Sequence, residues 1–349
     1  MQLFRSILSR RMLALILCAV LIYVNAFTSV KVFAKVCTNQ PAFRCTANKQ
    51  AEADQAHNND LAITAKAAVL IDNASGRILY AKNKDKKLIP ASITKIMTLL
   101  LIFESIEQGK CKLEDKVTVS EYAASMGGSQ VFLEPGETQD VNTMIKCISI
   151  ASANDAAVAM AEHLAGSEQS FVKRMNKKAK ALGMKHTHFK NCNGLDDSIE
   201  SGHYSSAYDV ALMSQSLVSK YPDISKYSTV WMDAITHITK KGKKKFGLTN
   251  TNKLIRTYQG ITGLKTGSTS KAKYCLSATA QRDGISLTAV IMAGAYWCSR
   301  SFSDATEDSS STMMPIRATR VSIRVPPFRK IRTISLSPRK RSPVVSRRK

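Results

Sequence analysis

PASITKIMTLLL, residues 90–101, places a serine and a lysine three positions apart at the start of a strongly apolar segment. The apolar run continues through Phe103, and this composition predicts a helix that is buried on nearly all sides. Pro90 is tolerated in a first helical turn, where its missing N–H would have no partner. We therefore expect Ser92 near the helix N-terminus and Lys95 one turn later on the same face. An ordinary N-terminal serine followed by a lysine that reaches for solvent has the same pattern, so the rest of the chain must decide.

The segments on either side of this helix predict one domain with strands at both ends and helices between them. Residues 67–80 form two short strand patterns around a glycine-containing turn, and residues 263–292 return to strands. Residues 113–261 combine turn-rich pieces with helical patterns at 142–150, 155–164, 168–182 and 207–219. We therefore expect an α+β fold in which both ends of the domain form one antiparallel sheet, with helices on its faces and a helical insertion beside a cleft.

Two further polar motifs belong to this pattern. Ser152 and Asn154 form a Ser-x-Asn cluster just before an apolar helix, and residues 263–268 (GLKTGS) begin the C-terminal strands. Alone, the first is an ordinary helix cap and the second an edge strand whose glycine leaves room. Together, S-x-x-K, S-x-N and K-T-G in this order, separated by about 60 and about 110 residues, are the serine acyl-transfer set of penicillin-binding proteins and class A β-lactamases.

The chain resembles this superfamily from about Ala67 to about Asp304, and within it most closely the low-molecular-mass penicillin-binding proteins that act as D-alanyl-D-alanine carboxypeptidases. Besides the three motifs, the resemblance includes residues 68–76, 127–136, 193–195 and 203–206. It implies a β-lactamase/transpeptidase-like fold with a five-stranded antiparallel sheet. It also implies removal of the terminal D-alanine from peptidoglycan stem peptides through an acyl-enzyme, with β-lactam antibiotics as acylating inhibitors and with no cofactor.

The resemblance implies catalytic roles for the first two motifs. Ser92 would be the nucleophile and Lys95 the base, because a serine hydroxyl is a poor nucleophile until its proton is taken. Beside a buried helix an ammonium is poorly solvated, and Lys265 as a neighbouring cation would further favour the neutral amine. By the same resemblance, Ser152 relays a proton between Lys95 and the leaving group, and Asn154 holds both Lys95 and the substrate amide.

The third motif would bind substrate. Lys265 and Thr266 would receive the terminal carboxylate of the peptide, and Gly267 would let the substrate backbone approach the strand edge, to which an extended peptide can add. The family pattern supplies the two oxyanion donors from the backbone N–H groups of Ser92 and Ser268.

Two other functions remain open from the sequence. A class A β-lactamase would deacylate with a glutamate on a loop about thirty residues after S-x-N. The corresponding residues 186–193 (HTHFKNCN) contain no glutamate, and the second motif is Ser-Ala-Asn instead of Ser-Asp-Asn. A non-catalytic cell-surface binding protein is the other alternative, but it predicts a broken motif, and all three motifs are intact.

The ends of the chain differ from the predicted catalytic domain, residues 65–305. Residues 1–34 combine early arginines with a thirteen-residue apolar run and small-residue patterns, which predicts a signal peptide cleaved after Ala26 or Ala34, and hence an extracytoplasmic protein. A single membrane anchor is the rival, although spanning needs ~20 apolar residues. Residues 35–64 predict a flexible polar linker.

Most of the formal net charge of +25 lies at these ends. Residues 1–35 hold five basic residues and residues 309–349 hold twelve, with no acidic residue in either segment. We therefore expect no specific nucleic-acid partner, but association of the basic ends with membrane or wall polymer. Residues 306–349 show no sustained helical period and predict a disordered basic tail. We interpret this tail as out-of-frame translation that begins near residue 305.

No metal site is predicted. The seven cysteines outside the N-terminal apolar run are scattered without metal-ligand spacing. His203 shares no ligand spacing with His186 or His188.

Overall fold

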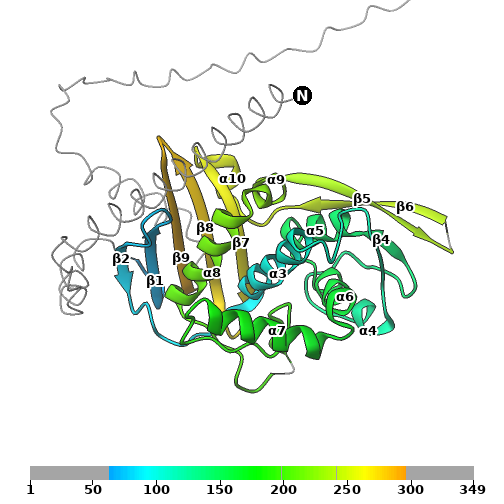
Figure 1. Cartoon of the computed structure of the whole chain (residues 1–349), viewed down its shortest axis with the longest axis horizontal. Helices are drawn as coiled ribbons and strands as arrows, with labels where there is room; N and C mark the ends of the chain where they lie inside the picture. Colours follow the sequence, from blue (N-terminus) through cyan, green and yellow to red (C-terminus); the bar gives the residue numbers. More distant parts are fainter. Residues whose placement is uncertain (1–62, 198, 241, 296–349) are drawn as a thin grey trace, which may run out of the picture.

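The computed structural model describes residues 63–295 apart from 198 and 241. Its centre is an antiparallel sheet of five strands in the order β2-β1-β9-β8-β7, so strands from both ends of the described chain lie side by side (Figure 1). This confirms the predicted sheet. Its strands are β1 (Ala67–Asp72), β2 (Ile78–Lys82), β7 (Ile261–Thr269), β8 (Lys273–Arg282) and β9 (Ile285–Gly294).

Both faces of the sheet are apolar, and successive residues of β1 divide between them. Val69 joins the main core beneath the helices, whereas Leu70 joins a second cluster with Ile63 and Leu254 on the opposite face. Strands that are covered on both faces read as nearly continuous apolar runs, as AAVLID in β1 does.

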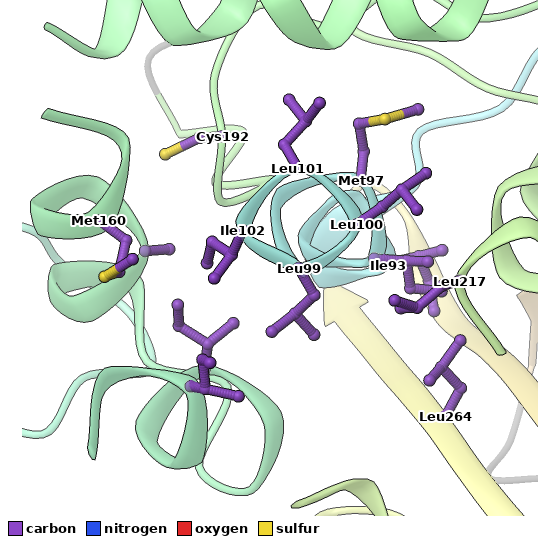
Figure 2. Packing of buried hydrophobic residues seen from close by; sticks show 14 of the residues in the cluster. Ile93, Met97, Leu99, Leu100, Leu101, Ile102, Met160, Cys192, Leu217 and Leu264 are labelled. Carbon is purple, nitrogen blue, oxygen red and sulfur yellow. The ribbon is translucent and has the colours of Figure 1, made fainter. Parts of the chain in front are cut away.

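One helix passes through the middle of the main core. Helix α3 (Lys95–Glu107) follows directly after the 3-10 turn η1 (Ala91–Thr94). Figure 2 shows its side chains pointing outward in several directions, with Met160, Leu217 and Leu264 from three other elements around it. This packing confirms the prediction of a helix buried on nearly all sides, and it gives the serine and lysine of the first motif a rigid support.

The remaining helices form a lobe beside α3 and a cover on the sheet. The lobe contains α4 (Glu121–Ala124), α5 (Val141–Ser149), α6 (Asn154–Ala165), α7 (Glu168–Ala181) and the short strand pair β3 (Lys116–Thr118) and β4 (Thr138–Asp140). Helix α8 (Ala207–Lys220) packs on β9, β1 and β8, and is followed by η2 (Pro222–Ile224) and α9 (Ser225–Ser228). The caps are local sequence effects, because the side chains of Asp140, Ser167 and Ser206 each accept a backbone N–H at a helix start.

A long hairpin lies within residues 113–261, where the sequence predicted helical patterns and turn-rich pieces but no strands. Strands β5 (Met232–Thr239) and β6 (Gly242–Thr249) pair in register before the short helix α10 (Leu254–Thr257). In β6 the apolar alternation is limited to Phe246 and Leu248, because lysines occupy most of its first half. The strand pattern was therefore too weak to recognise.

Several predictions fall outside the described residues. The predicted signal peptide, most of the linker and the whole basic tail lie there, as do the last residues of the predicted catalytic domain. Ile63, which the sequence places in the linker, is buried against the sheet. Between residues 63 and 295, leaving out 198 and 241, no helix has both the length and the apolar character that crossing a membrane requires.

Candidate active site

The three sequence motifs meet between the sheet and the helical lobe. Ser92 lies in η1 and Lys95 begins α3, while Asn154 begins α6 and Ser152 lies two residues before it. Lys265 comes from β7, the edge strand of the sheet. The fold thus joins residues separated by more than 100 positions, since the side chains of Lys265 and Ser152 are in direct contact.

The amine of Lys95 is at the centre of the cluster. Its Nζ lies 3.0 Å from Ser92 Oγ, 2.6 Å from Asn154 Oδ1 and 2.7 Å from the backbone oxygen of Asn193. The side chain is fully buried. Burial, followed by the charge of Lys265, lowers the pKa of Lys95 well below its usual value. The environment thus favours the neutral amine, as expected from the sequence.

A second buried amine lies beside the first. Lys265 Nζ donates to Ser152 Oγ at 2.8 Å, and burial lowers the pKa of Lys265 to about 7. Sequence reasoning placed Ser152 next to Lys95, but within the described part of the chain no hydrogen bond joins these two side chains. Ser152 also has a φ of 61°, in the left-handed region where non-glycine residues are strained. Such strain persists only where the surroundings over-determine the backbone, and it is common at functional sites.

The Asn193–Gly194 turn provides the backbone contact to Lys95. Gly194 has a φ of 82°, and a Cβ at this position would lie 1.8 Å from the backbone oxygen of Ala91. Only glycine therefore permits this close approach of the turn to η1. Sequence reasoning included the turn in the family resemblance but did not predict that its carbonyl holds the lysine.

Asn154 is fixed by the loop that precedes β4. Its backbone N–H donates to the Ser129 oxygen and its side-chain Nδ2 donates to the Gly127 oxygen, both at 2.7 Å. With Nδ2 occupied in this way, Oδ1 is directed at Lys95. The orientation of the amide therefore follows from its hydrogen bonds.

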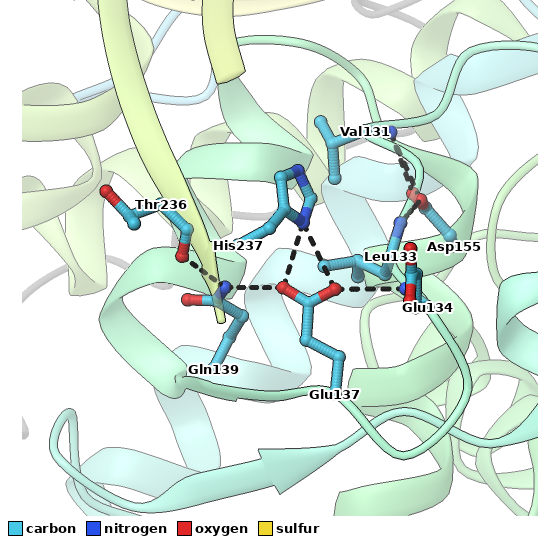
Figure 3. Close-up of polar contacts among 8 residues, drawn as sticks. All are labelled: Val131, Leu133, Glu134, Glu137, Gln139, Asp155, Thr236 and His237. Atoms are coloured by element: carbon cyan, nitrogen blue, oxygen red, sulfur yellow. Dashed lines mark hydrogen bonds and ion pairs between the residues drawn. The ribbon is translucent and has the colours of Figure 1, made fainter. Parts of the chain in front are cut away.

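The next residue, Asp155, is hydrogen-bonded to the same loop. Its buried carboxylate accepts the backbone N–H groups of Val131 and Leu133, as Figure 3 shows. Burial raises the pKa of Asp155, although these backbone donors act in the opposite direction. Further along the loop, the carboxylate of Glu137 contacts His237 of β5 at 2.9 Å (Figure 3). Sequence reasoning missed both contacts. Asp155, in the first turn of α6, has the ordinary appearance of a cap, and Glu137 belongs to none of the three motifs.

Strand β7 approaches η1 closely at the third motif. A Cβ on Gly267 would lie 3.0 Å from the Pro90 oxygen and from the backbone nitrogens of Ser92 and Ile93. The hydroxyl of Thr266 is hydrogen-bonded to that of Thr251, a residue that no sequence motif indicated. Ser268 is exposed on the edge strand. The glycine is thus needed for contact between strand and turn, in addition to its expected role of leaving room for substrate.

The histidine that sequence reasoning set aside has an internal partner at each ring nitrogen. His203 Nδ1 accepts the N–H of Lys190 at 3.1 Å, so Nε2 carries the proton and donates to Thr94 Oγ1 at 2.9 Å. Burial lowers the pKa of His203 to about 4, which keeps this tautomer neutral. Among the described residues, the one trio with ligand atoms close enough for a metal is Cys111, Asp115 and His163, and it shares no residue with the three motifs.

Comparison with known proteins agrees with this geometry. The Peptidase S11 family, described as D-alanyl-D-alanine carboxypeptidase, matches residues 50–295. The chain belongs to this family. It is 54% identical over 241 residues to the D-alanyl-D-alanine carboxypeptidase DacF of Bacillus subtilis, a match that covers 69% of this chain and 60% of that protein. It is 38% identical over 238 residues to the D-alanyl-D-alanine carboxypeptidase DacA of Escherichia coli K12, a match that covers 66% of this chain and 57% of that protein. The family resemblance inferred from the motifs is therefore confirmed.

Solved structures of carboxypeptidase-family proteins and their relatives share the fold. The DD-transpeptidase of Streptomyces K15 superposes with a TM-score of 0.65 at 26% identity, over 73% of this chain and all of that one. Penicillin binding protein 5 of Haemophilus influenzae superposes with a TM-score of 0.61 at 33% identity, over 73% of this chain and 71% of that one. The chain spans about 60% of the length of the first curated relatives that it matches.

Proposed function

We propose that this protein is an exported serine-type D-Ala-D-Ala carboxypeptidase, which removes the terminal D-alanine from peptidoglycan stem peptides through an acyl-enzyme on Ser92. The observation that carries the proposal is the environment of Lys95 Nζ, which lies 3.0 Å from Ser92 Oγ with its pKa held low by burial. Membership of the carboxypeptidase family supports the choice of substrate.

The hydrogen-bond partners of Lys95 explain how it acts as a base. A neutral amine has two N–H groups and one lone pair. Asn154 Oδ1 and the Asn193 backbone oxygen can only accept, so they take the two hydrogens. The lone pair is then directed at Ser92 Oγ, whose hydroxyl donates to it. Transfer of that proton to Lys95 leaves the alkoxide that attacks the peptide carbonyl.

The second amine and the edge strand serve substrate binding. Lys265 and the Thr266 hydroxyl receive the terminal carboxylate, and the peptide backbone adds to the free edge of β7. Backbone N–H groups of Ser92 and Ser268 stabilise the oxyanion. The proton that Lys95 has taken from Ser92 then passes to the leaving D-alanine nitrogen. A relay through Ser152, which the family resemblance implies, requires the Ser152 hydroxyl to turn from Lys265 towards Lys95 when substrate is bound. Attack of water on the acyl-enzyme then completes hydrolysis.

The environment of Glu168 argues against the β-lactamase alternative. Its Oε1 accepts the Cys192 N–H at 3.0 Å and its Oε2 accepts the Tyr122 hydroxyl at 2.7 Å. Both oxygens of this carboxylate are therefore occupied, although it lies beside the residues 186–193 that would correspond to the deacylating loop. A penicilloyl-enzyme should thus persist, and turnover of nitrocefin at many cycles per second would contradict the assignment.

Labelling with a fluorescent penicillin tests the nucleophile. The wild-type chain should be labelled covalently and should release D-alanine from a pentapeptide that ends in D-Ala-D-Ala, whereas Ser92→Ala should do neither. Labelling that survives in this variant would exclude Ser92 as the nucleophile. A chain that is labelled but transfers the acyl group to an amine, without releasing acid product, would be a transpeptidase like its Streptomyces K15 neighbour.

Substitutions of the two lysines should lower the acylation rate to different extents in the same assay. Lys95→Ala removes the base and should eliminate acylation, while Lys265→Ala removes substrate anchoring and should leave slow residual acylation. Acylation rate constants measured over a series of penicillin concentrations separate the two effects. A wild-type rate in either variant would contradict its role.

The ends of the chain complete the proposal. We expect residues 1–34 to direct export and the basic tail from residue 306 to lack a fold of its own. Sequencing of the coding DNA decides whether the tail arises from a frameshift. If the alternative frames after codon 305 encode no amphipathic helix followed by strands, the frameshift hypothesis is wrong and the basic arm is genuine.

A further inference from the structure

The β5–β6 hairpin projects from the body of the molecule. Each strand has eight residues, so the hairpin is about 25 Å long, and Figure 1 shows it extending past α5 and β4. One of its faces is firmly attached to the helical lobe. His237 contacts Glu137, the Thr236 oxygen accepts from Gln139, and the Phe246 ring packs on Phe132 at a centroid distance of 5.8 Å. The hairpin is therefore a rigid extension with a defined outer face.

The charged residues in the sequence around this hairpin are almost all positive. From Ala234 to Arg282 the chain contains nine lysines, two arginines and no aspartate or glutamate. Four of the lysines lie exposed at the far end of the hairpin, at positions 240, 243, 244 and 245. None of these four forms an ion pair within the described residues, whereas the acidic group at the base, Asp233, is bound to Lys146. Lys245 also interacts electrostatically with Asp233, but the end of the hairpin as a whole carries an excess of positive charge.

An apolar side chain lies among these charges. Ile238 is 58% exposed and pairs directly across the strands with Lys243. It alternates with the inward-facing His237, so it points to the outer face, together with Thr236 and the exposed Met232. A polyanion in solution would be matched by the lysines alone. An apolar side chain surrounded by long cationic side chains instead fits the boundary between lipid headgroups and acyl chains.

We infer that the end of the β5–β6 hairpin docks on an anionic phospholipid surface. Ile238 enters the boundary of the acyl region, and Lys243 and Lys245, which lie on the same face, contact the headgroup phosphates. Lys240 near the turn and Lys244 on the other face add positive charge close to the surface. This contact is separate from the chemistry on Ser92, and it is additional to any attraction through the basic ends of the chain. It would present the cleft at a fixed orientation to the membrane, because the hairpin is held rigidly to the lobe that carries Asn154.

Vesicle co-sedimentation of the full chain tests this inference. Vesicles of phosphatidylglycerol and phosphatidylcholine in equal parts serve as the probe, with pure phosphatidylcholine as the neutral reference. The variant Lys243→Gln/Lys244→Gln/Lys245→Gln should bind the anionic vesicles about 100-fold more weakly than the wild type, since each lysine near such a surface contributes about five-fold. Ile238→Ser should weaken binding about ten-fold.

A matched control separates docking from general charge. Lys173→Gln/Lys177→Gln/Lys180→Gln removes the same three charges from exposed positions on α7 and should change vesicle binding much less. The lysine variants and Ile238→Ser should be labelled by penicillin at the wild-type rate, which shows that they are folded. Ser92→Ala should bind vesicles normally, so a failure of the proposed catalysis leaves the docking result unaffected.

Two results would overturn the inference. Equal losses of vesicle binding in the hairpin and α7 variants would show that only the total charge matters. Long-chain inorganic polyphosphate provides the second comparison. If the hairpin lysines are needed to bind polyphosphate while Ile238→Ser leaves vesicle binding unchanged, the surface binds a soluble polyanion and the assignment to a membrane is wrong.

Discussion

Replacing Gly267 by alanine should slow acylation while leaving the fold intact. The added Cβ would lie 3.0 Å from three backbone atoms of the turn that carries Ser92, whereas ordinary contact begins at 3.4 Å. Strand β7 and η1 would have to separate by roughly 0.4 Å, because backbone atoms on both sides leave no flexible side chain to move. Since a misplacement of about 1 Å costs about 100-fold in rate, we expect an acylation rate five- to ten-fold below the wild type.

The assay is the second-order rate constant for labelling by a fluorescent penicillin, followed by thermal unfolding of the same samples. Overpacking at one contact should lower the free energy of unfolding by about 1 kcal/mol. Gly247→Ala in β6 is the matched control, because a Cβ there has no atom within 4 Å. The reasoning fails if Gly267→Ala acylates as fast as Gly247→Ala, since the close approach of β7 to η1 would then have no bearing on the chemistry.

Four further predictions concern pH and stability. Because the pKa of Lys265 is about 7, its cation is lost as the pH rises past that value, so kcat/KM for a D-Ala-D-Ala peptide should fall above about pH 7. Lys265→Arg should abolish that decline at a lower absolute rate, and an unchanged profile would contradict the assignment. The same depressed pKa makes the Lys265 contribution to the free energy of unfolding rise with pH between about 7 and 10.5, which denaturation at several pH values can detect. Glu137→Gln leaves buried donors of His237 and Gln139 without a charged acceptor and should cost about 2 kcal/mol in urea denaturation, so a loss below about 0.5 kcal/mol would show that the contact is dispensable. Leu99→Ala opens a cavity beside α3 and should cost about 3 kcal/mol, whereas a value near 1 kcal/mol would mean that the core collapses around it.

The sheet and the central helix could be predicted from the sequence because local patterns of apolar residues and turns indicate both. The apolar run after Lys95 has no polar face, and α3 is accordingly surrounded by core. The strands at the two ends show apolar runs bounded by glycine turns. The β5–β6 hairpin was missed because β6 is rich in lysine and because β5 owes its position to contacts such as that of His237 with Glu137, 100 residues away. Such contacts leave no periodic signal in either segment.

The site was predictable as a set of residue types but not as a set of contacts. The three motifs named the side chains that meet around Lys95. They could not show that Ser152 is bonded to Lys265, because both lysines are compatible with the same spacing. The roles of Gly194 and Thr251 could not be predicted either, because each depends on contact with a distant segment. Gly194 lies against η1, and Thr251 is hydrogen-bonded to Thr266 in β7.

The pairing of β1 with β9 has a consequence for how the molecule is made. Asn73 and Thr288, which are hydrogen-bonded through their side chains, stand 215 residues apart in the chain. The first strand to be synthesised therefore has no permanent neighbour on that side until nearly all of the described chain exists. Closing so long a loop is slow compared with local folding. The N-terminus predicts export, and a chain that is exported must stay unfolded until it has crossed the membrane. A sheet that cannot close early favours that unfolded state. The same arrangement means that the sheet and the site beside it form together, after β9 has been synthesised.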